Sequence, residues 1–325
     1  MISFKRFINN LTFIDLFSGI GGFHFALHKL GLKCVFASEI NKDARISYEI
    51  NFKKISPHLF KKNNFNEDIY NQEKQQIPNF DICCAGFPCQ PFSQIGKKRG
   101  FNENFEGRGN LFFQIVEILK VKKPRAFLLE NVQHLVNHNN GETFKIIKET
   151  IGKLNYSFYY KVIRASDFNL PQHRPRTFMV GFYNEKENNK YFQFPKPIKL
   201  KKTMSDILNG KCNREIGFTL RLGGAGSGIN DRRNWDRYLV NGKERQVLPE
   251  QGLKMQGFPN NYFLSNSKRT SMKLLGNSVA VNVVKYIALE MLEYMYDKKK
   301  YILKKGSKQL NLTLHVSPNT TFHDI

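Results

Sequence analysis

The sequence predicts a doubly wound α/β fold of the Rossmann-like type, with a second, smaller domain. Short apolar runs alternate with longer amphipathic segments over residues 11–182, which is typical of a parallel sheet with crossover helices. A glycine-rich turn follows the first apolar run. After about residue 184 the composition changes to prolines, charges and glycines. The length of 325 residues fits one large or two modest domains.

The expected elements follow from the spacing of the apolar residues. Short continuous apolar runs indicate buried strands, whereas apolar residues three and four positions apart indicate helices. The expected strands are residues 11–16, 33–38, 80–84, 126–130, 157–163 and 177–182, and the expected helices are 22–30, 41–51, 109–121 and 141–153.

A smaller module is expected where the segment FPKPIKLKK is followed by the glycine-rich LRLGGAGSGINDRRNW. Residues 272–296 then predict one helix, because apolar residues recur every four positions from Leu275 to Met291. This helix is expected to pack back on the first domain. The predicted boundaries are 1–183 plus 272–297 for the first domain, 184–271 for the module, and 298–325 for a basic, partly ordered tail.

The charge of the chain favours a polyanionic partner. Lys and Arg number 51 against 27 Asp and Glu, a formal net charge of +24, which is typical of nucleic-acid binding. The alternative is the lysine- and asparagine-rich composition of proteins from AT-rich genomes. No apolar run approaches the roughly 18 residues of a membrane span. We see no secretory signal, and five cysteines, an odd number, fit a reducing cytoplasm.

The stretch FIDLFSGIGGFHFAL combines a strand, a glycine turn and a helix start. Gly19, Gly21 and Gly22 let the backbone approach a ligand at the helix N-terminus. The dinucleotide pattern G-x-G-x-x-G is not met, because its third glycine falls at His24. Glu39 ends the next expected strand, where a carboxylate can bind ribose hydroxyls. These residues favour an adenosine ligand, and the alternative is a tight structural turn.

Cys89 follows the strand of DICCAGFPCQPFSQ, at the sheet edge where open α/β sheets bind ligands. Such a thiol can be a nucleophile, a redox centre, a metal ligand or an inert loop residue. Cys83, Cys84 and Cys89 lack a paired C-x-x-C spacing and a nearby histidine, so we expect no metal. Cys83 and Cys84 are expected in the core of the strand.

Three further blocks carry polar residues at element ends. FLLENV brings Glu130 to the same sheet edge, PQHRPR places Arg174 and Arg176 on one face of a strand, and KLLGNSV puts Asn277 before a helix. An ordinary ion pair, two solvated arginines and a helix cap are the respective alternatives. None of the three decides the function alone.

Taken together and in this order, the blocks resemble the cytosine-5 DNA methyltransferase family, in particular its bacterial modification enzymes. The resemblance rests on DLFSGIGG, GFPCQPFS, ENV, QHRPR, QGFP and GNSV, and covers about residues 11–182 and 252–296. It implies an S-adenosylmethionine-dependent methyltransferase domain with a target-recognition domain, acting on double-stranded DNA and releasing S-adenosylhomocysteine. It also implies a monomer, with a cognate restriction endonuclease encoded nearby.

The resemblance assigns the chemistry to four residues. Carbon 5 of cytosine is a weak nucleophile, and the family first adds a thiolate, matched by Cys89, to carbon 6. Glu130 matches the residue that hydrogen-bonds ring nitrogen 3 and is protonated there. Arg176, with Arg174, matches the residues that hold the ring carbonyl oxygen and the nucleophile. The target cytosine must be flipped out of the duplex.

The resemblance also assigns binding residues. Those for the cofactor are Phe17, Gly19, Gly21, Gly22, Glu39, Ile40, Asp68, Ile69, Phe87, Leu111 and Asn277. Those for the substrate strand are Gln90, Ser93 and Arg108, within a segment slightly longer than we expect for the family's active-site loop. Sequence readout is expected within residues 219–246, since arginine pairs with guanine and glycines allow close approach: Arg221, Arg232, Arg233 and Arg237.

Three rival functions are a non-catalytic DNA-binding module, an NAD-dependent oxidoreductase and a transfer RNA methylase. The first predicts the loss of a catalytic residue, and Cys89, Glu130 and Arg176 are all present. The missing third glycine disfavours the second. The separate basic module at residues 184–271 favours duplex DNA over transfer RNA.

Overall fold

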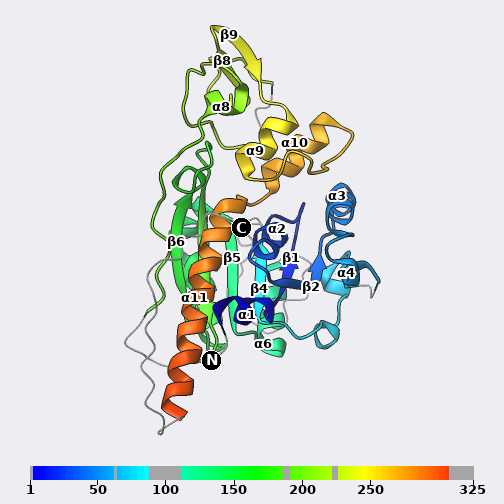
Figure 1. Ribbon diagram of the computed structural model, residues 1–325, viewed down its shortest axis with the longest axis vertical. Coiled ribbons are helices and arrows are strands. Elements are labelled where there is room, and N and C mark those ends of the chain that lie inside the picture. Colours follow the sequence, from blue (N-terminus) through cyan, green and yellow to red (C-terminus); the bar gives the residue numbers. More distant parts are fainter. Residues whose placement is uncertain (1–2, 62–63, 88–110, 186–190, 222–225, 307–325) are drawn as a thin grey trace.

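A seven-stranded sheet forms the centre of the protein (Figure 1). The computed structural model describes residues 3–61, 64–87, 111–185, 191–221 and 226–306, without the side chains of 298–306. The strand order is β3-β2-β1-β4-β5-β7-β6. The strands are β1 (Thr12–Leu16), β2 (Lys33–Ser38), β3 (Phe65–Asn66), β4 (Ile82–Gly86), β5 (Ala126–Val132), β6 (Tyr159–Arg164) and β7 (Pro175–Phe182).

The sheet is mixed, so the expected parallel pairing holds for five of its strands and is wrong for β7. β7 pairs antiparallel with both β5 and β6, whereas β1 to β5 pair in parallel. The link from β6 to β7 holds only the 3-10 turn η4 (Ala165–Asp167), and a link without a crossover helix cannot carry the chain back for a parallel strand. The amino end of β7 therefore lies at the same edge as the carboxyl ends of β1, β4 and β5.

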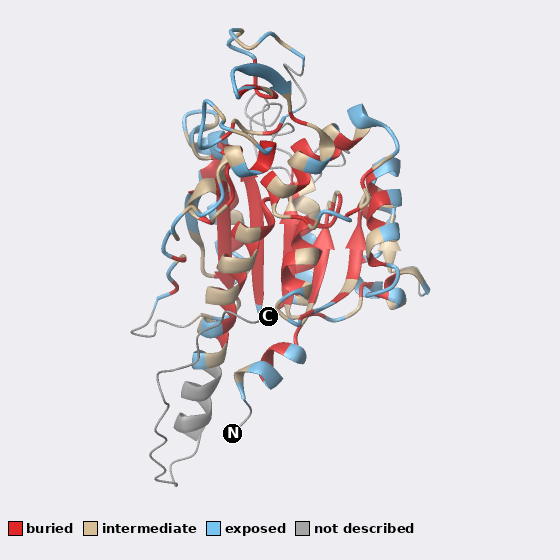
Figure 2. Ribbon diagram, turned by 45° about the horizontal axis from the view of Figure 1, so that its top comes forward, coloured by how far each residue is buried: buried red, intermediate tan, exposed pale blue. Residues whose placement is uncertain are grey.

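Helices cover both faces of the sheet, as a doubly wound fold requires. Successive strand residues alternate between two apolar clusters; Phe13 belongs to one and Ile14 to the other. The inner strands β1, β4, β5 and β7 are accordingly buried for most of their length, whereas the edge strand β6 is largely exposed (Figure 2). One cluster contains residues of α1 (Phe4–Asn9), α2 (Gly22–His28), α3 (Lys42–Phe52), α4 (Pro57–Lys61) and part of α11. The other contains residues of α6 (Leu111–Lys122), α7 (Glu142–Gly152) and the short turns η1 (Ile69–Asn71) and η3 (Gln133–Asn137). The turn η2 (Lys74–Gln76) contacts α6.

The expected single helix at 272–296 is two helices, α10 (Lys268–Asn277) and α11 (Val281–Gly306). The break occurs because Ser278 is extended and its carbonyl accepts a hydrogen bond from Arg174. α11 packs against α2, which confirms the expected contact with the first domain. It continues through residues 298–306, so this part of the expected tail is helical. Within the described part of the chain, no helix is long and apolar enough to cross a membrane.

A small module stands at one end of the sheet (top of Figure 1). It contains α8 (Met204–Leu208), the hairpin β8 (Arg237–Val240) and β9 (Lys243–Gln246), and α9 (Pro249–Gln256). Asn241 and Gly242 both have positive φ, which fits the two-residue turn that joins the hairpin strands. Trp235 and Tyr238 are buried in a cluster continuous with that of the sheet. The predicted boundaries at 183 and 271 stay a proposal.

Candidate active site

A cavity of about 640 Å³ opens at the carboxyl edge of the sheet, beside the point where the strand order reverses between β1 and β4. Its size is ordinary for a site that binds a small molecule. Most of the residues singled out from the sequence line it: Phe17, Gly19, Glu39, Ile40, Asp68, Ile69, Phe87, Leu111, Glu130, Arg174, Arg176 and Asn277.

Glu39 holds a fixed carboxylate in one wall. Its Oε2 accepts a hydrogen bond from the Gly19 amide at 2.7 Å, and its Oε1 accepts one from the Asn41 amide at 2.7 Å. Burial raises the pKa of Glu39, although these backbone donors oppose the rise. Ile40 beside it is 67% exposed, so an apolar side chain is available to a ring. This pairing suits a nucleoside.

The neighbouring carboxylates of Glu67 and Asp68 differ in their partners. Glu67 forms an ion pair with Arg45, whereas Asp68 accepts a hydrogen bond from the Tyr70 amide at 3.0 Å. Lys74 supports the same segment, because its Nζ donates to the Ile69 carbonyl at 2.6 Å. Both carboxylates line the cavity, and among the described residues only Glu67 of the two forms an ion pair.

The three glycines of the turn after β1 have different environments. Gly19 has φ +55°, and a Cβ there would have no atom within 4 Å. At Gly21 (φ +83°) a Cβ would lie 2.2 Å from Phe52 Cε2, and at Gly22 it would lie 2.5 Å from Val279 Cγ2. Gly21 and Gly22 do not line this cavity, and their assignment to the cofactor site stays a prediction. They allow close packing.

Ser18 supplies a polar atom without a partner. It is buried and lines the cavity, and its Oγ has no hydrogen bond with any described residue. Buried hydroxyls are nearly always bonded, so an unpartnered one beside a cavity indicates a polar ligand. Together with Glu39, Asp68 and the Gly19 backbone, it makes a donor and acceptor set that fits S-adenosylmethionine, a nucleoside with a charged amino-acid end.

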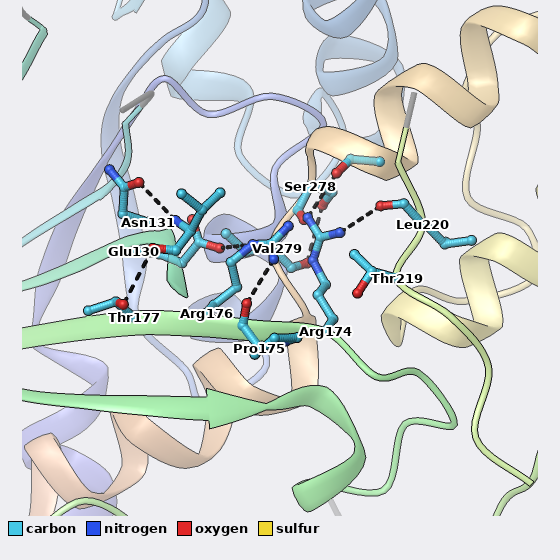
Figure 3. Close-up of polar contacts among 12 residues, drawn as sticks. Glu130, Asn131, Arg174, Pro175, Arg176, Thr177, Thr219, Leu220, Ser278 and Val279 are labelled. Atoms are coloured by element: carbon cyan, nitrogen blue, oxygen red, sulfur yellow. Dashed lines mark hydrogen bonds and ion pairs between the residues drawn. The ribbon is translucent and has the colours of Figure 1, made fainter. Parts of the chain in front are cut away.

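Glu130 and Arg176 meet at the far wall (Figure 3). Glu130 lies near the carboxyl end of β5 and Arg176 near the amino end of β7, and Glu130 Oε1 lies 3.1 Å from Arg176 Nε. Burial raises the pKa of Glu130, while the charges of Arg176 and Arg174 partly oppose the rise. The carboxyl group therefore holds a proton at a higher pH than an exposed glutamate does.

Arg174 is committed to backbone carbonyls (Figure 3). Its Nη1 donates to Leu220 O at 3.0 Å, and its Nη2 donates to Gly276 O at 2.8 Å and to Ser278 O at 2.6 Å. Burial, and then the charge of Arg176, lower the pKa of Arg174 to about 9, so it remains a cation at neutral pH. These hydrogen bonds join the start of β7 to the small module and to the α10–α11 junction. This structural role of Arg174 was not predicted from the sequence.

Two further polar residues were missed as contributors. Asn131 is buried and donates from Nδ2 to the Phe87 carbonyl at 2.8 Å, which holds the chain just before the segment with Cys89. Gln172 is buried and joins the small module through hydrogen bonds with Leu220 and Met255. Asn131 belongs to the ENV block and Gln172 to the QHRPR block. Their place in these two motifs was the sequence signal that could have identified them.

Four predicted site residues, Cys89, Gln90, Ser93 and Arg108, lie outside the described residues. Phe87 and Leu111, on either side of that segment, both line the cavity. The four arginines proposed for sequence readout lie in the small module: Arg221, Arg232 and Arg233 are exposed and Arg237 is half-buried.

The fold and the cavity define a Rossmann-like domain for a nucleoside cofactor, with a buried acid and an arginine facing the same space. A profile described as C-5 cytosine-specific DNA methylase matches residues 11–221 and 221–293. The chain belongs to the C-5 cytosine-specific DNA methylase family. The chain is 36% identical to the type II methyltransferase M.HhaI of Haemophilus parahaemolyticus, over 89% of this chain and 96% of that protein. It is 38% identical to M.DsaV of Dactylococcopsis salina, over 88% and 87%.

Solved structures share the fold at lower identity. A Spodoptera frugiperda DNMT2 variant superposes with a TM-score of 0.65 at 20% identity, covering 87% of this chain and all of that one. The S. pombe Dnmt2 methyltransferase superposes with a TM-score of 0.65 at 21% identity, covering 89% of this chain and all of that one. These likenesses support the Rossmann-like fold class.

Proposed function

We propose that the protein is a DNA (cytosine-5-)-methyltransferase that methylates a flipped-out cytosine within a specific short duplex sequence. The observation that carries the proposal is the Glu130–Arg176 pair, since a buried acid with a raised pKa faces the cavity that fits the cofactor. Such an acid can donate a hydrogen bond to a neutral ring nitrogen, which an ionised carboxylate cannot do.

In the proposed reaction, the Cys89 thiolate bonds to carbon 6 of the cytosine. Glu130 hydrogen-bonds ring nitrogen 3 and offsets the negative charge that enters the ring. S-adenosylmethionine, when bound, supplies an electrophilic methyl group for carbon 5. The carbon-5 proton then leaves to a base, and the electron pair released expels the thiolate from carbon 6. Arg176, whose Nε lies 3.1 Å from Glu130 Oε1, would keep Glu130 oriented and would contact the ring carbonyl.

The cofactor is proposed to lie along the carboxyl edge of the sheet. Glu39 would accept hydrogen bonds from the ribose hydroxyls, Ile40 would pack on the adenine ring, and Asp68 with Ile69 would meet the adenine edge. The Ser18 hydroxyl and the turn at Gly19 would meet the amino-acid end. Phe17, Phe87, Leu111 and Asn277 complete the wall.

Double-stranded DNA is the proposed substrate, with the small module as its reader. We infer a monomer, because one chain carries both the cavity and the module. A restriction-modification role is proposed, with a separately encoded endonuclease that is not a stable subunit, and a cytoplasmic location. The similarity to M.HhaI and M.DsaV, both type II methyltransferases, supports this role.

Bisulfite sequencing of DNA from a host that expresses the gene tests the reaction and the site together. We expect protected cytosines confined to one short sequence context. Thermal stabilisation by S-adenosylhomocysteine but not by NAD is the matching binding result. Unprotected DNA from cells that contain the folded protein would refute the function.

The covalent step has its own test. Cys89→Ala should abolish methyl transfer and leave DNA binding largely intact, because the thiol acts in the bond-forming step. A duplex with 5-fluorocytosine should trap the wild-type enzyme when cofactor is present, since fluorine cannot leave as a cation. Turnover near the wild-type rate in Cys89→Ala, or the absence of a denaturation-resistant adduct with the wild-type enzyme, would contradict the assignment of Cys89 as nucleophile.

A further inference from the structure

The loop over residues 226–236 lies close to the cavity. Arg174, in the cavity wall, donates to the carbonyl of Leu220 at 3.0 Å. The next residue, Arg221, donates from Nη2 to the carbonyl of Arg233 at 2.9 Å. A Cβ on Gly276, also in the wall, would lie 3.2 Å from Arg221 Cα. Two hydrogen bonds, from Arg174 to Leu220 and from Arg221 to Arg233, thus connect the cavity wall to the backbone at Arg233.

Buried polar side chains hold this loop in place. Asp236 is 2% exposed, and its Oδ2 accepts hydrogen bonds from the Gly226 amide at 3.0 Å and from Gln246 Nε2 at 2.7 Å. Asn234 is also buried, and its Nδ2 donates to the Ile229 carbonyl at 3.3 Å. A contact surface that must distinguish bases needs such a fixed backbone.

Asp231 forms hydrogen bonds along one edge of the Arg233 guanidinium. Its Nε lies 3.0 Å from Asp231 Oδ1, its Nη2 lies 2.7 Å from Oδ2, and its own amide donates to Oδ1 at 2.7 Å. The Arg233 side chain is 69% exposed, so the pair adds little stability, and its main effect is on direction. Guanidinium carries five N–H donors, so the Nη1–Nη2 end remains available for a bidentate pair with guanine O6 and N7.

The neighbouring arginines differ in whether an acidic partner neutralises their charge, and this difference indicates different roles. The Arg233–Asp231 pair is neutral and gains little from phosphates, whose attraction depends on net positive charge. Arg237 pairs through Nη1 with Glu244 of the hairpin and is half-buried. Arg232 is exposed and makes no side-chain hydrogen bond or ion pair with the described residues, so its whole charge faces outward.

We infer that Arg233, oriented by Asp231, reads a guanine in the major groove, whereas Arg232 neutralises a backbone phosphate. The inference deepens the proposed function and rests on it. The candidate arginines thus have different roles according to their partners. Arg233, which Asp231 orients and neutralises, selects the sequence, whereas Arg232, unpaired among the described residues, adds affinity for any DNA.

The test compares full-length Arg233→Lys, Asp231→Asn and Arg232→Gln on a library of duplexes, read by bisulfite sequencing. Lysine keeps the charge of Arg233 but not its two-pronged geometry, so methylation should relax at one position of the site, by about 5- to 150-fold. Asp231→Asn should relax the same position. It should also steepen the salt dependence of binding, because it removes a negative charge.

Arg232→Gln is the matched control. It should weaken binding to all duplexes alike and reduce the slope of log K against log salt by about 0.9, the value for one phosphate contact. Unchanged discrimination in both Arg233→Lys and Asp231→Asn, or relaxed discrimination in Arg232→Gln, would overturn the inference. Failure of the proposed function is distinguishable, because the wild-type enzyme would then leave every cytosine in the library unmethylated.

Discussion

At the scale of single residues, the protonation of Glu130 is the property on which the proposed chemistry depends. Burial raises its pKa against the opposing charge of Arg176. The acid form is lost as pH rises through this raised pKa, whereas the Cys89 thiolate is lost as pH falls. We therefore expect turnover to pass through a maximum with pH, with Glu130 responsible for the alkaline limb.

Glu130→Gln tests this assignment. Glutamine keeps the shape and a hydrogen-bond donor but cannot share a proton, so turnover should fall about 10²- to 10⁴-fold and the alkaline limb should vanish. The pH profile of kcat measures both effects, and the melting temperature with S-adenosylhomocysteine provides the control for folding. A variant that retains the alkaline limb would move the acid role to another residue.

At the scale of elements, the glycine turn after β1 allows a paired comparison of Gly19→Ala and Gly21→Ala. Both residues have positive φ, but only at Gly21 would a methyl group overlap Phe52. We expect Gly21→Ala to lower the free energy of unfolding by about 2–4 kcal/mol, from overpacking and backbone strain together. Gly19→Ala should cost about 1 kcal/mol.

For cofactor binding we expect the larger effect in Gly19→Ala, the reverse of the order expected for stability. Gly19 lines the cavity, so its methyl group should weaken S-adenosylhomocysteine binding more than Gly21→Ala does once folding is accounted for. Denaturant unfolding and calorimetric titration measure the two quantities. Equal stability losses in both variants would contradict the packing role given to Gly21.

The reversed strand β7 brings two arginines to the site with different tasks. Arg174→Lys should destabilise the protein, because lysine cannot reach three carbonyls with fixed donors, and an imperfectly paired buried group costs about 1–3 kcal/mol or more. Arg176→Lys, whose guanidinium faces the cavity and Glu130, should leave stability nearly unchanged and lower kcat. Thermal unfolding and steady-state kinetics of both variants check this division, and a kinetic defect in Arg174→Lys without a stability loss would reverse it.

At the scale of the whole molecule, the basic C-terminal segment follows the last buried turn of α11 in the sequence. Within the described residues, the buried face of α11 reaches Met295, and the lysine-rich segment begins at Lys298. Removal of residues 298–325 should therefore flatten the salt dependence of DNA binding and leave the methylated sequence unchanged. Filter binding at several salt concentrations, with bisulfite sequencing, tests this; a changed site would show that the tail reads sequence.

The sequence by itself determined the alternation of strands and helices, the glycine turn and the ends of β1 and β2, whereas β4 and β5 end two residues later than expected. These depend on local apolar spacing and on turn residues, which act within a few positions. Because parallel strands end at one edge, Gly19, Glu39 and Glu130 were expected together, and they line one cavity.

Only the tertiary structure decided the direction of β7, the break between α10 and α11, and the separate tasks of Arg174 and Arg176. Each depends on partners distant in sequence. Arg174 bonds Leu220, Gly276 and Ser278, and the last of these bonds holds the chain out of the helix that its apolar spacing favours. A buried cation must be satisfied by whichever carbonyls the fold brings to it, and local spacing carries no record of them.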